Sequence, residues 1–438
     1  MSSFENAQER DMILFVGSYL KTQTDALKKI SKLLGRNIHG LVLLDITNPK
    51  SKDQKDIKSK TNRITFIEVD FSSSTAIQNV LKKYEDRFLA VTCRAEKNIP
   101  LFKKIIPNVP YLNSPTETSL DWTTDKIKMR RMLRNYDKSI SPKFLVVHDS
   151  TKETLDRIEK NIGFPLILKP SGLAASLLIT ICYYREELED NLKNTIKKIN
   201  QVYKKRKGRG EPQILVEEFM EGSMYSVDVY VNQRGVTYFT PLVHVRTGRS
   251  IGFDDFFNYM RVTPTILKPH KIEAARRVAD KAIKALNIRS VTCHIELMKT
   301  EDGWKIIELG PRIGGFRHEM YELSFGIDHT MNDILIRIPK KPILNKKVRG
   351  YTVALKFYAK KKGRLVNIKG INKSKKLESY QNILTYKKKG DMCDFARNGD
   401  DAVFDLVLFN VKRSKVLADV RRVEKSIDIQ VSSQKRKK

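Results

Sequence analysis

The chain reads His294-Ile295-Glu296-Leu297 and then, after a short turn, Ile306-Ile307-Glu308-Leu309-Gly310-Pro311-Arg312-Ile313-Gly314-Gly315. Both halves have the apolar character of short strands, and Thr300-Glu301-Asp302-Gly303 between them is a hairpin signal. We therefore predict that Glu296 and Glu308 lie on neighbouring strands. Two carboxylates that share a face repel each other unless a cation lies between them, and hard oxygen ligands near a phosphate binder suit Mg2+.

The composition indicates a globular chain with several domains. Its 438 residues suggest about three domains of ordinary size, and 40% hydrophobic residues are enough for buried cores. Residues 1–10 lack the pattern of a signal peptide, and no apolar run approaches a membrane span. The cysteines, Cys93, Cys182, Cys293 and Cys393, are too scattered for clustered metal ligands or a disulfide framework. We expect a cytoplasmic protein with no membrane partner.

The charge is unusual, because 83 Lys and Arg against 50 Asp and Glu give a net charge of +33. Such a field attracts anions, so nucleic acid is the obvious rival partner. The basic residues are nevertheless spread along the chain, and no basic cluster carries the interleaved aromatic residues of a base-stacking platform. We interpret the charge mainly as a solvated surface and do not expect nucleic acid as the partner.

The N-terminal third has the pattern of a parallel α/β sheet. Apolar segments at 12–18, 41–46, 63–69 and 88–92 are typical of strands, and 25–34 and 75–84 of helices. Gly17 stands alone after the first strand, which argues against a Rossmann dinucleotide site. Turn residues at 107–115 predict a domain boundary near residue 115.

The rest of the chain alternates helices with strands that favour antiparallel pairing. We expect a basic helix at 124–134, capped by Thr123 or Thr124, and further helices at 185–203, 271–286 and 414–423. A basic glycine segment, 204–210, is expected to be a surface loop. Strands are expected at 144–148, 166–169, 177–184, 214–218, 225–231, 236–242, 351–358, 365–368 and 405–410.

Two further segments have residues suited to nucleotide binding. Lys169 ends the apolar run 164–168, and the small residues of 171–176 follow it, so backbone N–H groups and one ammonium can cradle phosphate. The run 216–222 leads an apolar strand into Glu217, Glu218, Phe219 and Met220, a crossover that can form a purine slot. The alternative interpretations are an ordinary Lys-Pro turn and an ordinary hairpin with solvated acids.

Arg312 follows the second carboxylate strand and precedes Gly314 and Gly315, with Arg317 and His318 close behind. Donors and permissive backbone at such a place suit an oxyanion or acyl phosphate. The structural alternative is an arginine that pairs with Glu308. Similarly, the segment 244–261, with Arg246, Arg249, Phe253, Phe256, Phe257 and Tyr259, is either a substrate loop or a packed surface loop.

Taken in order, these motifs resemble the ATP-grasp superfamily: Asp125-Lys126, the Lys169 strand and its loop, the 217–222 hinge, and finally Glu296, Glu308 and Arg312. The chain is most similar to the carboxylate–amine ligase branch, which includes L-amino-acid ligases and carnosine-synthase-like enzymes. This similarity rests on the histidine in His294-Ile295-Glu296 and on the Gly310–Gly315 segment. The resemblance implies an N-terminal parallel-sheet α/β domain at 1–115, a two-lobed α+β ATP-grasp domain at 116–340 with its small lobe at about 140–215, and a β-rich C-terminal lobe with a basic tail at 341–438.

The resemblance also implies residue roles. ATP phosphates would be held by Lys126 and Lys169, with Ser171, Gly172 and Ser176 of the loop, and the adenine slot would be lined by Glu217, Glu218, Phe219 and Met220. Mg2+, with Mn2+ as a substitute, would be bound by Glu296 and Glu308. His294 would approach the phosphates, and Arg312 would stabilise an acyl phosphate or the substrate carboxylate. The chain departs from the family at Gly310, where many members have a metal-binding asparagine, and at Met224, where a ribose-binding glutamate is common. Its phosphate loop also lacks the usual glycine string.

These implied roles describe an ATP- and Mg2+-dependent ligase that joins a small-molecule carboxylate, an amino acid, to an amine through an acyl phosphate and releases ADP and phosphate. Two alternatives stay open: a carboxylase-type ATP-grasp enzyme that uses bicarbonate, and a nucleotide- or polyanion-binding protein without ligase turnover. The motifs specify neither the two substrates nor the oligomeric state.

Overall fold

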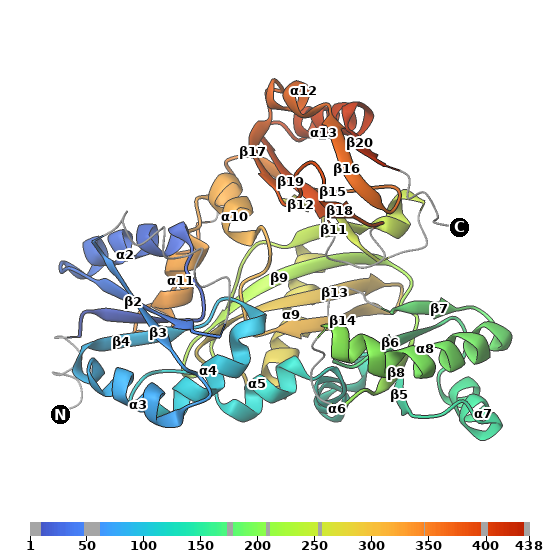
Figure 1. Cartoon of the computed structure of the whole chain (residues 1–438), viewed down its shortest axis with the longest axis horizontal. Coiled ribbons are helices and arrows are strands. Elements are labelled where there is room, and N and C mark those ends of the chain that lie inside the picture. The colour runs from blue at the N-terminus through green and yellow to red at the C-terminus, as the bar shows by residue number, and fades with distance from the viewer. Residues whose placement is uncertain are drawn as a thin grey trace.

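A computed structural model describes residues 10–47, 62–172, 178–206, 211–252, 256–345, 347–395 and 402–432. Four sheets organise this part of the chain (Figure 1). The N-terminal domain lies at one end of the long axis and the small lobe of four strands at the other, with a nine-stranded sheet between them (Figure 1). In the described part of the chain, no helix combines the length and the apolar character needed to cross a bilayer.

The N-terminal sheet is parallel, as its apolar runs predict, with strand order β3-β2-β1-β4. Its strands are β1 (Met12–Val16), β2 (His39–Asp45), β3 (Ile64–Val69) and β4 (Phe88–Thr92), and its helices are α2 (Lys21–Leu34), α3 (Ser74–Lys82) and α4 (Ile99–Ile105). Apolar side chains cover both faces, and one of the two clusters includes residues of α11 (His329–Leu335). The N-terminal domain is therefore packed against an element that follows the carboxylate hairpin in sequence.

Two helices, α5 (Glu117–Thr124) and α6 (Lys126–Tyr136), connect the N-terminal domain to the small lobe. The basic helix expected at 124–134 is present as α6, but the cap expected at Thr123 or Thr124 is wrong, because α5 runs to Thr124 and the chain breaks at Asp125. The Asp125 carboxylate accepts hydrogen bonds from the backbone N–H groups of Ile127 and Lys128. Aspartate is a strong N-cap because its carboxylate satisfies backbone donors that have no partner inside the helix. This cap starts α6 at Lys126.

The small lobe is an antiparallel sheet of order β5-β8-β6-β7. It consists of β5 (Phe144–Val147), β6 (Leu166–Pro170), β7 (Thr180–Cys182) and β8 (Ile214–Glu218), with α7 (Lys152–Asn161) and α8 (Arg185–Arg206). The strand expected at 177–184 is shorter than predicted. The loop expected from 204 begins later, because α8 continues to Arg206, and residues 207–210 lie outside the described residues.

The nine-stranded sheet is antiparallel and has the order β14-β13-β9-β11-β12-β15-β19-β17, with β10 paired to β9. Its first strands are β9 (Ser223–Val231), β10 (Thr237–Phe239), β11 (Val243–Thr247), β12 (Asn258–Thr263), β13 (Val291–Thr300) and β14 (Gly303–Gly310). The strand expected at 236–242 is the shorter β10, which ends before Pro241; proline cannot donate to a strand ladder. β11 and β12 lie largely within 244–261, which was expected to be a loop. Helix α9 (Pro269–Ala285) connects β12 to β13, and α10 (Arg317–Phe325) and α11 follow β14 in sequence.

The C-terminal strands continue the same sheet, since β15 (Tyr351–Tyr358), β17 (Tyr380–Thr385) and β19 (Ala402–Asn410) extend it beyond β12. A three-stranded sheet of β16 (Gly363–Lys369), β18 (Met392–Cys393) and β20 (Asp428–Val431) lies over them with α12 (Ile371–Lys375) and α13 (Arg413–Ser426). The elements expected at 351–358, 365–368, 405–410 and 414–423 are thus all present, within a few residues. The division into three domains stays a prediction.

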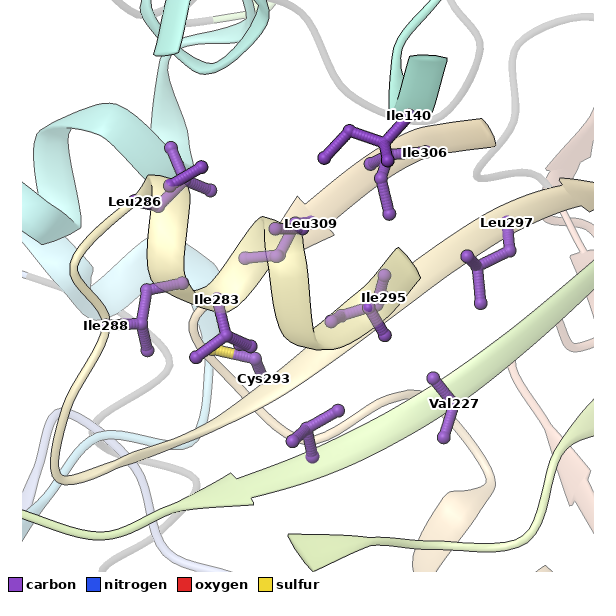
Figure 2. Packing of buried hydrophobic residues seen from close by; sticks show 14 of the residues in the cluster. Ile140, Val227, Ile283, Leu286, Ile288, Cys293, Ile295, Leu297, Ile306 and Leu309 are labelled. Carbon is purple, nitrogen blue, oxygen red and sulfur yellow. The ribbon is translucent and has the colours of Figure 1, made fainter. Parts of the chain in front are cut away.

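Figure 2 shows the core beneath β13 and β14. Ile295 and Leu297 of β13 and Leu309 of β14 pack toward Ile283 and Leu286, which α9 and its end contribute. Successive side chains of a strand point to opposite faces, so residues between these apolar positions face away from the core. The burial of Ile295 and Leu297 therefore turns Glu296 toward the opposite face of the sheet.

Candidate active site

The two carboxylates of the hairpin are direct partners: Glu296 pairs with Glu308 across β13 and β14. Only Glu301 and Asp302 lie between the two strands, as the turn signal predicts. The prediction that the two glutamates lie on neighbouring strands is therefore confirmed. A β-bulge lies directly after this pair, between Glu296 and Leu297, and bulges often redirect side chains at functional sites.

Glu296 and Glu308 face a cleft of about 470 Å³ between the nine-stranded sheet and the small lobe. Eight predicted site residues line it, from four separate segments of sequence: Lys126, Lys169, Glu217, Glu218, Phe219, Met220, Glu296 and Glu308. Apolar residues, among them Ile167, Ile179 and Met298, line it as well. An apolar cavity with a few converging charges is typical of a small-molecule site.

The chemistry of the carboxylate pair fits Mg2+. In the described part of the chain, no group of three or more His, Cys, Asp or Glu side chains has the geometry to hold a metal ion by itself. Mg2+ in nucleotide enzymes is commonly bound by one or two carboxylates, with phosphates and water completing its octahedron. Lys126 Nζ lies 3.2 Å from Glu308 Oε1, so a cation already faces this carboxylate. The pair therefore fits a metal that arrives with a phosphate ligand.

A buried ion cluster orients Lys169 at the end of β6. Lys169 Nζ lies 2.7 Å from Glu217 Oε2, and Arg130 of α6 donates to both Glu217 oxygens at 2.6 and 3.2 Å. Burial lowers the pKa of Lys169 to about 8, although Glu217 opposes that shift. Burial alone would raise the pKa of Glu217, but the charges of Arg130 and Lys169 lower it to about 2. Glu217 thus remains a carboxylate that holds the lysine toward the cleft.

Arg130 also connects the hinge to the carboxylate hairpin of β13 and β14. It donates hydrogen bonds to the backbone carbonyls of Ile306 and Ile307, the latter at 2.6 Å. Sequence reasoning missed this arginine. Its signal was present: Arg130 lies four residues after Lys126 on a predicted helix, and such residues share one helix face.

The hinge segment after β8 presents an aromatic ring to the cleft. Phe219 lies beneath the guanidinium of Arg249, whose Cζ is 4.6 Å from the ring centroid. Glu218 forms an ion pair with Lys305 of β14, which joins the hinge to the hairpin a second time. Met220 is mostly buried beside these residues. The hinge is therefore held in place by β14, and its ring lines the cleft with the Arg249 guanidinium over one face.

His294 does not line the cleft but is fixed beside it by Asp228 of β9. Asp228 Oδ1 lies 2.6 Å from His294 Nδ1, Asp228 Oδ2 lies 2.6 Å from His329 Nε2, and His329 Nδ1 lies 2.5 Å from the Tyr230 hydroxyl. The other ring nitrogen, His294 Nε2, is 3.6 Å from Glu296 Oε1. This chain links buried residues of α11 and β9 to a predicted metal ligand.

Asp228 also accepts a hydrogen bond of 2.8 Å from the backbone N–H of Gly314. A Cβ at Gly314 would lie 2.4 Å from His294 Nδ1, so only glycine allows the turn to approach so closely. Burial would raise the pKa of Asp228, yet its contacts with His294 and His329 hold that pKa well below its ordinary value. Sequence reasoning missed Asp228; an acid inside the apolar run 225–231 was the available signal.

Arg312 Nε donates to Glu96 Oε2 at 3.0 Å. Its carboxylate partner is thus in the N-terminal domain, and the alternative pairing with Glu308 is not what the structure shows. Glu96 was not singled out, because nothing in its local sequence indicates a partner that lies 216 residues away. A Cβ at Gly310 would lie 3.5 Å from the same Glu96 oxygen, so Gly310 directly adjoins this ion pair.

Ser171 and Gly172 lie apart from the cleft. The Gly172 N–H donates to the Tyr203 hydroxyl at 2.6 Å, and both residues border a second hollow of about 700 Å³ that α4 and α5 also line. Ser176 lies outside the described residues. In the predicted substrate loop, His244 to Thr247, Arg249, Ser250, Phe256 and Asn258 line the main cleft, whereas Phe257 and Tyr259 belong to the C-terminal core and Phe253 lies outside the described residues.

Residues 162–319 match a family model described as the ATP-grasp domain. The chain carries an ATP-grasp domain. The match includes Lys169, the hinge and both hairpin carboxylates, and it ends just after Arg312. The predicted resemblance is thereby confirmed.

Relatives of known name are distant. The alanine–anticapsin ligase of Bacillus amyloliquefaciens is 28% identical over 220 residues, which are 47% of this chain and 44% of that protein. The D-alanine–D-alanine ligase of Thermoanaerobacter sp. is 25% identical over 249 residues, 53% of this chain and 64% of the ligase. The chain thus matches less than two thirds of either ligase. A longer match, 24% identical over 84% of this chain and 74% of the relative, is to the uncharacterised protein y4rH of Sinorhizobium fredii.

Solved structures share the fold along nearly the whole chain. The L-amino acid ligase of Bacillus licheniformis has a TM-score of 0.76 at 17% identity and covers 97% of this chain and 100% of its own. The phosphoribosylglycinamide synthetase of Anaerococcus prevotii has a TM-score of 0.66 at 20% identity with the same coverage. The parallel N-terminal sheet and the antiparallel sheets around the ATP-grasp domain are therefore those of full-length ATP-grasp proteins.

Proposed function

We propose that this protein is an ATP- and Mg2+-dependent ligase that joins an amino-acid carboxylate to an amine through an acyl phosphate. The observation that carries the proposal is the cross-strand pair Glu296 and Glu308, which faces the same cleft as Lys126, Lys169 and the Phe219 hinge. The matched alanine–anticapsin and D-alanine–D-alanine ligases support the choice of an amino acid as substrate.

Each cleft residue has a role in this proposal that follows from its charge. Glu296 and Glu308 would hold Mg2+, or Mn2+ in its place, and the metal when bound supplies charge neutralisation for the transferring phosphoryl group. Lys126 and Lys169 would contact the ATP phosphates. Glu217 to Met220 would line the adenine slot, where the Glu217 carboxylate acts through Lys169 because both its oxygens are already occupied.

The reaction has two steps. An oxygen of the substrate carboxylate attacks the γ-phosphorus of ATP. The bond between this phosphorus and the oxygen that bridges it to the β-phosphate breaks, and ADP leaves. The amine then attacks the carbonyl carbon, the C–N bond forms, the C–O bond to phosphate breaks, and the nitrogen loses a proton. Arg312 would stabilise the negative charge of the acyl phosphate, and His294, fixed by Asp228, would approach the phosphates. Phosphoryl transfer depends more on positioning and charge neutralisation than on covalent participation, so these residues suffice.

The test is phosphate and ADP release with pools of amino acids and amines, with the ligated product read by mass spectrometry. Release that requires both a carboxylate and an amine supports the ligase. Release that requires bicarbonate and an acceptor would favour the carboxylase alternative, and a carbamoyl phosphate synthase from Methanosarcina barkeri is among the matched relatives. Salt-dependent RNA binding without any phosphate release would favour a polyanion-binding protein. Cys93, Cys182 and Cys293 are free and buried, which supports the proposed cytoplasmic setting.

A further inference from the structure

Arg317 is a buried cation that has no anionic partner among the described residues. Arg130, Arg317 and Arg337 are the largest fully buried side chains in the described part of the chain. Arg130 pairs with Glu217, and Arg337 pairs with Asp333. Arg317 instead donates to the Ser226 hydroxyl at 2.6 Å and to the Gly315 carbonyl at 3.0 Å, both neutral, and its Nε has no hydrogen-bond partner among the described residues.

A second arginine near it, Arg261 of β12, is also buried and also has a nitrogen without a hydrogen-bond partner among the described residues. Its side chain is 8% exposed, and its buried Nη1 has no hydrogen-bond partner in the part of the chain that the structure describes. Burial, together with the charge of Arg317, lowers the pKa of Arg261 to about 10. The ring of Phe316 lies 5.1 Å from the Arg261 guanidinium, and Phe316 adopts a left-handed backbone with φ of 63° to reach this place.

These arginines lie on the cleft side of the sheet, beside the metal pair. Residues paired across neighbouring strands point to the same face of a sheet. Such cross-strand pairs join Glu308 to Glu296, Glu296 to Ser226, and Ser226 to Val243. Val245, two residues further along the same strand, pairs with Arg261 and lines the cleft. Because side chains alternate along strands, Arg261 shares the face of Glu296 and Glu308. Three strand spacings and an offset of two residues separate Arg261 from Glu296, roughly 16 Å between backbones, a gap that both side chains shorten.

Two buried guanidinium groups that repel each other are costly unless an anion joins them. Glu296 and Asp405 are the acids whose charges act on Arg261. Asp405 of β19, the cross-strand partner of Lys356, accepts a hydrogen bond of 2.5 Å from the Tyr386 hydroxyl through Oδ2, and its Oδ1 has no hydrogen-bond partner among the described residues. Arg312 is likewise engaged with Glu96. Arg261 and Arg317 are thus two buried cations on this face of the sheet, each with a nitrogen that has no hydrogen-bond partner among the described residues.

We propose that Arg261 and Arg317 form a binding site for a second substrate carboxylate, separate from the carboxylate that is activated beside Glu296 and Glu308. The proposal rests on the ligase function and specifies its substrate class. The second carboxylate belongs either to a dicarboxylic acid or to an amine partner that is itself an amino acid. A planar guanidinium suits this role because it binds a carboxylate through two parallel hydrogen bonds.

The experiment compares substrates that differ only in this carboxylate. On the acid side, glutarate is compared with butyrate, each with methylamine; on the amine side, glycine is compared with methylamine, each with butyrate. ADP release is measured with ATP and Mg2+, and binding is measured by calorimetry with a non-hydrolysable ATP analogue and Mg2+. Both measurements are made for the wild type and for the Arg261→Gln, Arg261→Lys and Arg317→Gln variants. Arg289→Gln, a change on an exposed loop, is the matched control.

We expect the extra carboxylate to improve binding on one of the two sides. The Arg261→Gln and Arg317→Gln variants should weaken that binding by roughly 10- to 100-fold, as for a lost hydrogen bond to a charged group. The Arg261→Lys variant should recover part of it, and the KM for ATP should change less than twofold. The side that gains from the carboxylate identifies which substrate carries it.

The possible outcomes separate this proposal from the ligase function. Equal binding and turnover of all pairs by the wild type would overturn the second-carboxylate site and leave the ligase intact. Arginine-dependent carboxylate binding without ADP release from any pair would support the site and overturn the ligase. Should Arg261→Gln fail to fold, the wild-type comparison of glutarate with butyrate and of glycine with methylamine still decides the proposal.

Discussion

Glu296 and Glu308 face each other directly across β13 and β14, with the His294 ring 3.6 Å from the first and the Lys126 ammonium 3.2 Å from the second. Each carboxylate thus has its own basic neighbour, and the space between the two carboxylates opens to the cleft. This arrangement is ready to receive a metal and phosphate, because both bring charges that the surrounding groups complement.

The metal assignment predicts the effect of Glu308→Gln. The amide keeps the shape of the side chain but removes the negative charge, so we expect Mg2+-dependent ATP turnover to fall by roughly 100-fold or more. Circular dichroism should show an unchanged fold. Glu301→Gln, on the exposed turn of the same hairpin, is the control and should retain activity. Near-normal turnover by Glu308→Gln would show that this carboxylate binds no essential metal.

The hydrogen bonds of Asp228 predict a positioning role. Asp228→Asn weakens the hold on His294, His329 and the Gly314 turn together, so kcat should fall roughly 10- to 100-fold while the KM for ATP stays nearly constant. Asp333→Asn is a matched control, because Asp333 is equally buried and hydrogen-bonded but contacts Thr92, Thr292 and Arg337 instead. It should lower the melting temperature without a comparable loss of kcat. Equal losses of kcat in both variants would argue that Asp228 only stabilises the fold.

The ion cluster around Glu217 predicts a pH dependence of stability. The folded state lowers the pKa of Glu217 from 4.5 to about 2, so this stabilisation is complete above pH 4.5 and is lost as the pH falls toward 2. A shift of this size corresponds to roughly 3 kcal/mol of unfolding free energy. Urea unfolding of Glu217→Gln should lack this acid-dependent loss, and the variant should be destabilised at neutral pH by roughly 3–5 kcal/mol because Arg130 and Lys169 lose their partner.

The control for that experiment is Glu153→Gln, a change at an exposed position of α7. It should leave both the stability at pH 7 and its decline below pH 4.5 unchanged. An acid-dependent loss in Glu217→Gln equal to that of the wild type would mean that other carboxylates cause it.

The Phe219 ring predicts where adenine binds. Phe219→Ala removes the surface on which a purine would stack in the hinge, so the KM for ATP should rise roughly 10-fold with little change in kcat. Phe239→Ala is the matched control, since Phe239 lies beneath Arg276 as Phe219 lies beneath Arg249, but away from the cleft. An unchanged KM for ATP in Phe219→Ala would place the base elsewhere.

Much of the fold could be predicted because its signals are local. Alternating or continuous apolar residues indicate most strands of the four sheets, and the four residues Thr300 to Gly303 indicate the hairpin that pairs Glu296 with Glu308. The errors were local too. Asp125 was overlooked as a cap because a helix was assumed to run through it, and the strand expected at 236–242 ends at Phe239, before Pro241.

The sequence by itself determined that two carboxylates, two lysines and an acidic hinge occur in the order of an ATP-grasp domain. It could do so because strand periodicity and turn chemistry depend on neighbouring residues only. Only the tertiary structure decided the partners of these groups: Arg130 for Glu217, Glu96 for Arg312, Asp228 for His294, and, in the part of the chain that the structure describes, the neutral Ser226 hydroxyl for Arg317. These pairings join residues from 66 to 216 positions apart. Burial then makes each one decisive, because a charge removed from water needs a partner wherever the fold supplies one.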